Sequence, residues 1–384
     1  MMIIGTKIRL LPTKEQEVLF RKSCGISRWA YNYYLYKKKT QYKDYINGLT
    51  CIKNITGNDI RKEINKLKNC ITYSWLKDVG CNVIKQAVID AETIYNKFLK
   101  GLINKPHYKT KHKSLLSFYV NYETLRKTKD GFKGEKLGNV KTFNPLPKLK
   151  HSKHYSNPRI SYDGKYWYLS VSYEIETLNS IQLSNEVIGI DLGIKELATL
   201  SNGKIYKNIN KTKEIKRLNK KLKREQRKIS RKILINKKVN KKLNDCKNFQ
   251  KQKRKIKLIY RRITNIRTNY LHQTTTEIVK TKPSKIVMEN LNVRGMMKNK
   301  HLSKAIAEQK FYEFCRQIEY KCKYYGIEFV LADRFYPSSK TCSNCGNIKK
   351  DLKLKDHIYK CPICGNIIDR DLNAAINLAN YKKV

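Results

Sequence analysis

Two pairs of cysteines near the C-terminus have the spacing of a metal site. Cys342 and Cys345 are separated by two residues, fifteen residues follow, and Cys361 and Cys364 repeat the pattern. Four thiolates on two such knuckles can converge on one Zn²⁺, and the glycine after each pair permits the tight turn beneath the metal. Because this closed site leaves no position for water, we expect a structural zinc ion that contributes to folding.

Three acidic residues stand in apolar surroundings, in a chain where acids are scarce. Asp191 lies within VIGIDLGI, Glu289 follows IVM, and Asp371 begins the amphipathic segment DLNAAINLA. Buried carboxylates that lie together raise one another's pKa values unless a cation joins them, and their hard oxygen atoms suit Mg²⁺ or Mn²⁺. Asp191 alone would be interpreted as an Asp bonded within a turn. The ordered set of three indicates a divalent-metal site.

The elements that would hold these acids follow from hydrophobic periodicity. Residues 186–194 and 285–293 are apolar runs that predict buried strands, and 197–206 predicts a strand paired with the first of them. A helix at 303–325 and a strand at 326–333 are expected to complete this region. Asp191 would then lie within the first strand, Glu289 near the end of the second, and Asp371 at a helix start.

The N-terminal part of the chain follows a different pattern. Residues 1–12 predict a strand, and Thr13 with Gln16 predicts the N-cap of a helix that continues to about residue 45. Residues 58–100 are again helical in pattern, and 140–178 contains short strands. We therefore expect a β-rich module with helices inserted after its first strand.

The charge of the chain indicates a polyanionic partner. It contains 83 Lys and Arg against 31 Asp and Glu, a formal net charge of +52. Residues 211–271 predict basic helices with apolar stripes, which favours contact with a nucleic-acid backbone. A ribosomal, histone-like or membrane-surface protein would also be basic, so composition alone does not choose among these classes.

The remaining sequence features indicate a soluble intracellular protein. The other seven of the eleven cysteines are scattered, which is typical of a reducing compartment. The N-terminus lacks the pattern of a signal peptide, and no window approaches 18 uninterrupted apolar residues. We therefore expect a protein without a membrane partner.

The motifs together resemble those of a known family. GIDLGIKELAT, VMENLNV and DRDLNAAIN, the last following the cysteine pairs, look like the three motifs of RuvC-like nucleases in the TnpB family. This family comprises insertion-sequence proteins and is similar to the compact type V CRISPR effectors. Residues 7–35, 76–114 and 333–346 also resemble family segments, so the resemblance covers nearly the whole chain.

The resemblance implies an α+β multidomain fold with two parts. The first is a β-barrel-like wedge module at 1–12 and 114–180, into which a helical recognition domain at 13–113 is inserted. The second part is a RuvC/RNase H-like α/β nuclease core. Its segments are 181–336 and 366–384, its basic helices are 211–271, and its inserted zinc-binding module is 337–365.

By the same resemblance, Asp191, Glu289 and Asp371 match the catalytic acids. They would hold two Mg²⁺ (or Mn²⁺) ions about 4 Å apart, which activate water and stabilise the departing 3′ oxygen. Asp369 competes with Asp371 within DRD, but the acid followed by Leu-Asn-Ala-Ala fits the motif. We interpret Asp369 as the N-cap of the helix.

The family also implies the partners and the place of action. These are a guide RNA from the transposon end and double-stranded target DNA with an adjacent motif. One protein would act with one RNA in the prokaryotic cytoplasm, in association with the nucleoid. Five residues occupy stretches that face RNA or the target duplex in the family: Lys7, Arg9, Arg28, Lys85 and Gln86. Gln86 is our candidate for motif reading, because Gln pairs bidentately with adenine.

The implied activity is RNA-guided DNA cleavage for a transposable element. A compact type V CRISPR effector and a non-cleaving RNA-guided repressor are the alternatives within this class. A basic RNA-binding scaffold with a zinc ribbon is the alternative outside it, although it does not explain the order of the three acidic motifs.

Overall fold

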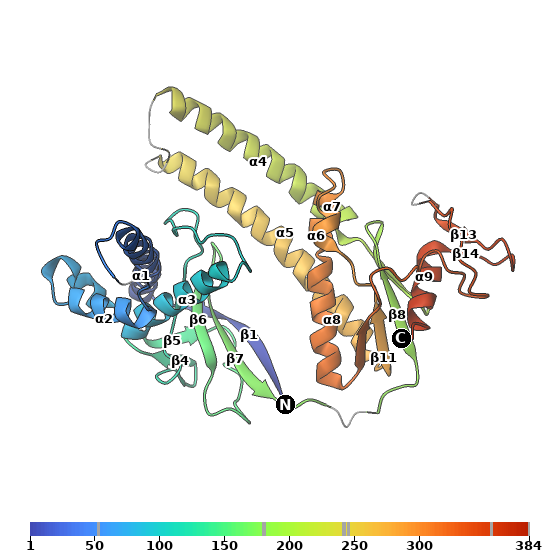
Figure 1. The fold of residues 1–384 in the computed structure, drawn as a ribbon, viewed down its shortest axis with the longest axis horizontal. Helices are drawn as coiled ribbons and strands as arrows, with labels where there is room; N and C mark the ends of the chain where they lie inside the picture. Colours follow the sequence, from blue (N-terminus) through green and yellow to red (C-terminus); the bar gives the residue numbers. More distant parts are fainter. Residues whose placement is uncertain (52–53, 179–181, 240–242, 244–245, 354–355, 383–384) are drawn as a thin grey trace. The chain divides into compact units, whose positions relative to one another are not determined.

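The computed structural model describes residues 1–51, 54–178, 182–239, 243, 246–353 and 356–382. The chain divides into two compact units, Met1–Ile175 and Glu176–Val384. Both units combine sheets with helices (Figure 1), which confirms the α+β class. Within the described ranges, every helix is too short or too polar to span a lipid bilayer.

The first unit is built on one antiparallel sheet of seven strands. These are β1 (Met2–Leu11), β2 (Ser117–Tyr119), β3 (Arg126–Lys127), β4 (Gly131–Gly134), β5 (Gly138–Thr142), β6 (Ser156–Tyr162) and β7 (Trp167–Ile175). Their order is β2-β6-β7-β1-β5-β4-β3, so the N-terminal strand lies in the middle. Among the described residues β2 and β3 are edges that do not pair with each other. The sheet is therefore open and forms no closed barrel there.

The helices of this unit lie between β1 and β2 in the sequence, as expected. They are α1 (Lys14–Ile46), α2 (Gly57–Leu67), the 3₁₀ helix η1 (Ile71–Asp78) and α3 (Cys81–Leu99). Thr13 and Gln16 form the predicted capping box at the start of α1. Phe20 of α1 packs on the sheet, 5.1 Å from Trp167 and 5.8 Å from Phe118 between ring centres. The wedge and recognition boundaries remain predictions.

The second unit contains a mixed sheet that carries two of the candidate acids. Its strands are β8 (Val187–Leu192), β9 (Glu196–Leu200), β10 (Ile205–Lys207), β11 (Lys285–Met288) and β12 (Glu328–Leu331), in the order β10-β9-β8-β11-β12. β8, β9 and β10 pair antiparallel, whereas β8, β11 and β12 are parallel. Ile188, Ile190 and Ile286 are fully buried, which confirms the buried strands expected from the apolar runs.

Helices cover both faces of this sheet. On one face, residues of α5 (Lys247–Lys280) and α8 (Phe311–Tyr325) join Ile188 and Ile286 in one apolar core. On the other face, Leu378 of α9 (Arg370–Ala379) packs against Val287. The short helices α6 (Val293–Met296) and α7 (Ser303–Gln309) precede α8.

The basic segment forms a helical hairpin. After the short η2 (Ile209–Lys211), α4 (Lys213–Lys238) lies beside α5, as Figure 1 shows in yellow-green and yellow. Their predicted apolar stripes meet, because Ile215, Leu218 and Leu222 share a core with residues of α5. Most of the lysines and arginines therefore lie outside this contact.

Candidate metal-dependent active site

The register of two parallel strands brings the first two acids together. β11 pairs with β8 so that Ile286 lies opposite Ile188 and Met288 opposite Ile190. Continuing this register by one residue sets Glu289 opposite Asp191, at the carboxyl end of β11. Neighbouring strands are about 4.8 Å apart, so the two side chains lie within reach of shared ligands.

The third acid reaches the same place on a helix that crosses β8. α9 lies directly on β8, and a Cβ atom added to Gly189 would be 1.9 Å from the carbonyl oxygen of Ala375. Only glycine permits this close approach of helix and strand. Asp371 stands in the first turn of α9 and adds to the electrostatic field at Asp191.

Burial is the largest cause of a raised pKa at each of the three carboxyl groups, and Asp191 is also affected by the other two. Burial raises the pKa of Asp191 to about 8, with further increases from Asp371 and Glu289 and an opposing effect of Arg370. Burial also raises the pKa of Glu289, against Arg370. The pKa of Asp371 is raised by burial and by Asp369. Nearby cations therefore do not neutralise the cluster, and its oxygen donors fit a divalent metal ion.

Asp369 has a different structural role from Asp371. Its side chain accepts hydrogen bonds from the backbone N–H groups of Asp371 and Leu372, at 2.9 and 3.1 Å. It is thus the N-cap of α9, which confirms the interpretation from sequence. The catalytic role of Asp371 itself remains a prediction.

The four cysteines form the tightest group of potential metal ligands in the described part of the chain. The sulfur atoms of Cys342, Cys345, Cys361 and Cys364 all lie within 4.8 Å of one another. The three acids do not form a group of this compactness in the described residues. Four thiolates at this separation can hold one tetrahedral Zn²⁺.

The backbone of each knuckle explains the glycine that follows it. Gly346 and Gly365 have φ values of +74° and +72°, which side chains disfavour. The N–H of Cys342 donates to the carbonyl of Asn347, closing the first turn. In the second knuckle, the backbone N–H of Asn366 lowers the pKa of Cys364 to about 6, which favours the metal-binding thiolate.

Two buried asparagines connect this zinc module to α9, and sequence reasoning did not identify them. Asn373 donates to the carbonyl of Thr341 at 2.7 Å and accepts from the N–H of Ser343 at 2.9 Å. Asn377 donates to the carbonyls of Ser338 and Thr341, both at 2.7 Å. Their four-residue spacing on an apolar helix face was the available signal. Through them the module holds the helix that carries Asp371.

The predicted nucleic-acid contacts lie in the first unit, and two of them sit on its sheet. The Lys7 ammonium is 4.4 Å from the ring centre of Tyr168, and the Arg9 guanidinium is 3.6 Å from that of Tyr166. These cation–π contacts orient both charges on the sheet. Their contact with RNA or DNA remains a prediction.

The other three candidates lie on helices. Arg28 is a partly exposed residue of α1, and Lys85 is exposed on α3. Gln86 donates to Asp90 at 3.0 Å, and Asp90 accepts two bonds from Arg159 at 2.7 and 2.8 Å. Gln86 therefore belongs to an ion-pair network instead of standing free in solvent.

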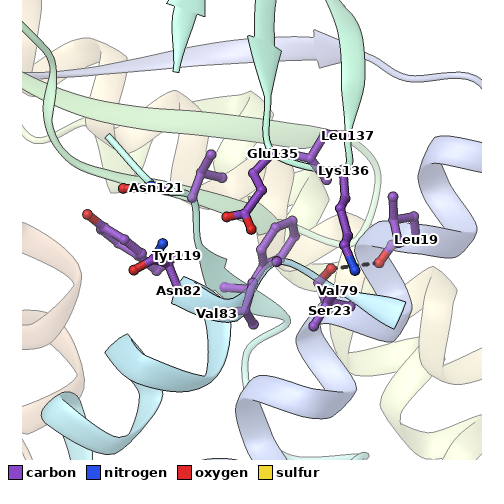
Figure 2. Close-up of a pocket in the computed structure, with 13 residues that line it drawn as sticks. Leu19, Ser23, Val79, Asn82, Val83, Tyr119, Asn121, Glu135, Lys136 and Leu137 are labelled. Atoms are coloured by element: carbon purple, nitrogen blue, oxygen red, sulfur yellow. Dashed lines mark hydrogen bonds between the residues drawn. The ribbon is translucent and has the colours of Figure 1, made fainter. Parts of the chain in front are cut away.

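An acidic side chain lines a small cavity beside the start of α3. Figure 2 shows Glu135 and Lys136 above Asn82 and Val83. The Glu135 carboxylate accepts the N–H of Cys81 at 3.4 Å, and a negative charge is favourable at a helix N-terminus. The cavity volume is about 10 Å³, which suffices for one water molecule at most.

The sequence and the fold of this chain are similar to those of known proteins. Three family models match: "Helix-turn-helix domain" of IS605 OrfB proteins at residues 1–46, "Probable transposase" of the same proteins at 170–300, and "Cas12f1-like, TNB domain" at 311–378. Among solved structures, a Cas12f1–sgRNA–target DNA complex has a TM-score of 0.51 at 16% identity, over 99% of both chains. This likeness concerns the fold.

Named relatives agree with these models. A Streptomyces pristinaespiralis protein named "Putative RNA-guided DNA endonuclease" is 29% identical over 97% of this chain and 87% of its own length. "TnpB-like protein L770" of Acanthamoeba polyphaga mimivirus is 26% identical over 98% of this chain and 72% of its own length. These matches run along nearly the whole chain, and they support a TnpB-family protein.

Proposed function

We propose that the protein is an RNA-guided DNA endonuclease of a transposable element, which cuts target DNA beside a short adjacent motif. The observation that carries the proposal is the strand register that sets Glu289 beside Asp191, with Asp371 close enough to perturb Asp191 from α9. The name of the Streptomyces relative, which matches 97% of this chain, supports the activity.

In this proposal, the second unit is a RuvC/RNase H-like core. Three antiparallel strands extended by two parallel ones, with helices on both faces, favour that assignment. The zinc module is an insertion that steadies α9 through Asn373 and Asn377. In the first unit, the sheet is the wedge module and its inserted helices are the recognition domain.

The three acids would act together as ligands of the catalytic metal ions. Asp191, Glu289 and Asp371 would hold Mg²⁺ or Mn²⁺, and two such ions supply an activated water and stabilise the departing 3′ oxygen. Asp191 must lose its proton before it binds metal, because its pKa is about 8. Glu289 and Asp371 would complete the set of carboxylate ligands at the same site.

Sequence selection is assigned to the guide RNA. An RNA–DNA duplex is held by its backbone, and the net charge of +52 with the basic α4–α5 hairpin suits that contact. We propose one protein with one guide RNA and one target duplex. Lys7, Arg9, Arg28, Lys85 and Gln86 are the proposed contacts of the first unit.

A compact type V CRISPR effector is the second candidate. The match of residues 311–378 to the Cas12f1-like TNB model favours it, since this segment includes the zinc module and part of α9. The neighbouring DNA decides between the two, being either a transposon end or a CRISPR array.

Cleavage by the purified protein with its co-purifying RNA tests the proposal. The RNA is sequenced, a plasmid with the complementary target is supplied, and cutting is measured with Mg²⁺ and with EDTA. We expect Asp191→Ala, Glu289→Ala and Asp371→Ala to abolish cutting while the RNA stays bound. Glu328→Gln, an exposed acid of β12, serves as the matched control. Robust cutting by Asp191→Ala would overturn the assignment.

A further inference from the structure

A pocket of about 240 Å³ lies next to the acidic trio in the second unit. Leu192, Glu289 and Leu331 contribute to it from the carboxyl ends of the parallel strands β8, β11 and β12. Ligands of open α/β sheets bind at this edge. The opposite wall is one face of α8, whose residues recur every three or four positions: Phe311, Tyr312, Cys315, Arg316 and Glu319.

Apart from the carboxylates of Glu289 and Glu319, the lining of this pocket suits a flat, neutral ring. Leu192 and Phe311 are buried, and burial raises the pKa of Cys315 to about 11, so this thiol is uncharged at neutral pH. The Arg316 guanidinium is engaged by the Glu313 carboxylate at 2.8 and 2.9 Å. A cavity of ~150 Å³ already holds benzene, so the available volume accommodates a nucleobase.

One aromatic ring stands at the rim of the pocket. Tyr312 is 73% exposed, although it is a large aromatic residue that lines the same pocket as the buried Phe311. An exposed ring beside an apolar pocket offers a stacking platform for any base, because every base has a π-face.

We propose that this pocket receives one unstacked base of the DNA strand being cut, with Tyr312 stacked on it. The proposal rests on the nuclease function proposed above. Glu289 belongs to both the pocket and the acidic trio, so a phosphate at the trio has its neighbouring base within reach of the pocket. A paired base cannot enter without leaving its stack. The pocket therefore favours cutting of unwound DNA without reading its sequence.

Targets with one abasic nucleotide, moved stepwise across the cut position, test the proposal. For the wild-type protein–RNA complex, we expect kcat/KM to fall about fivefold to 160-fold at one position, given 1–3 kcal/mol for base–aromatic stacking. Tyr312→Ala should show a similar loss on the intact target and no further loss at that abasic position. Tyr312→Trp should restore the dependence. Tyr324→Ala, on the same helix but outside the pocket, should behave as wild type.

A binding measurement separates failure of the pocket from failure of the nuclease assignment. Single-stranded oligonucleotides carrying 2-aminopurine are mixed with the protein in buffer without Mg²⁺ or Mn²⁺, where no cutting is expected and the structural zinc stays bound. We expect quenching of the fluorescence that Tyr312→Ala loses and Tyr324→Ala keeps. Equal quenching by wild type and Tyr312→Ala overturns the pocket. Tyr312-dependent quenching without any guided cutting supports the pocket and overturns only the nuclease function.

Discussion

Replacing Asp191 by Asn should stabilise the metal-free protein. A free Asp carboxyl has a pKa of 3.8, whereas burial, Asp371 and Glu289 raise the pKa of Asp191 to about 8. Asn has nearly the same shape and cannot ionise. The variant therefore avoids the free-energy cost of placing a charged carboxylate among other acids in the folded chain.

The sign and size of the effect follow from the two pKa values. Because the folded-state pKa is the higher one, the contribution of Asp191 to stability is complete below about pH 4 and is lost as the pH rises through 8. At about 1.36 kcal/mol per pKa unit, the whole loss is about 6 kcal/mol. Asp191 is partly accessible and water screens its charge, so this is an upper limit. Between pH 5.5 and 7.5 the limit is about 2.7 kcal/mol.

Urea unfolding at pH 5.5, 6.5 and 7.5, in buffer without Mg²⁺, Mn²⁺ or chelator so that the structural zinc stays bound, measures this difference. We expect the stability advantage of Asp191→Asn over wild type to grow by about 1–3 kcal/mol across this range. Mg²⁺ should then stabilise wild type and leave the variant unchanged, because only wild type retains the full ligand set. An advantage that stays constant with pH, or a variant less stable than wild type at pH 7.5, would refute the reasoning.

Three further substitutions test how the site is held. Gly189→Ala should lower the free energy of unfolding by about 1–3 kcal/mol and the cleavage rate at least tenfold, because the new Cβ displaces α9. Urea unfolding and cleavage assays measure both effects. The control is Gly5→Ala, where the atom nearest to the new Cβ is 4.0 Å away. Asn377→Ala should cost about 1–3 kcal/mol, because the carbonyls of Ser338 and Thr341 lose their donor; an unchanged urea midpoint contradicts this. Cys361→Ser should reduce the zinc content below one ion per chain and expose residues 337–365 to protease. The control Cys70→Ser should do neither. Full zinc occupancy in Cys361→Ser argues against the four-thiolate site.

The sequence predicted those features that depend on local spacing. Each pair has two cysteines three positions apart with a glycine directly after the second, and the structure brings all four sulfurs together. The N-caps at Thr13 and Asp369 were likewise readable, because a cap bonds only to the next turn of its own helix. The apolar runs around Asp191 and Glu289 also indicated buried strands, because an apolar run is a local pattern of the sequence.

Features that depend on contacts between distant segments were not readable. The close approach of α9 to Gly189 joins residues nearly two hundred positions apart. Asn373 and Asn377 looked like ordinary polar residues of an amphipathic helix, since their partners lie in the zinc module. Gln86 is our candidate for motif reading, and its link through Asp90 to Arg159 could not be predicted because it is also long-range. The open edges of the first sheet depend on the whole strand order.

The most direct test of the account is to locate bound Mn²⁺ by anomalous diffraction in crystals of the protein. We predict metal at the carboxyl end of β11, with oxygen ligands from Asp191, Glu289 and Asp371. Crystals of an active preparation that bind Mn²⁺ elsewhere, with these three side chains uncoordinated, would contradict the central claim.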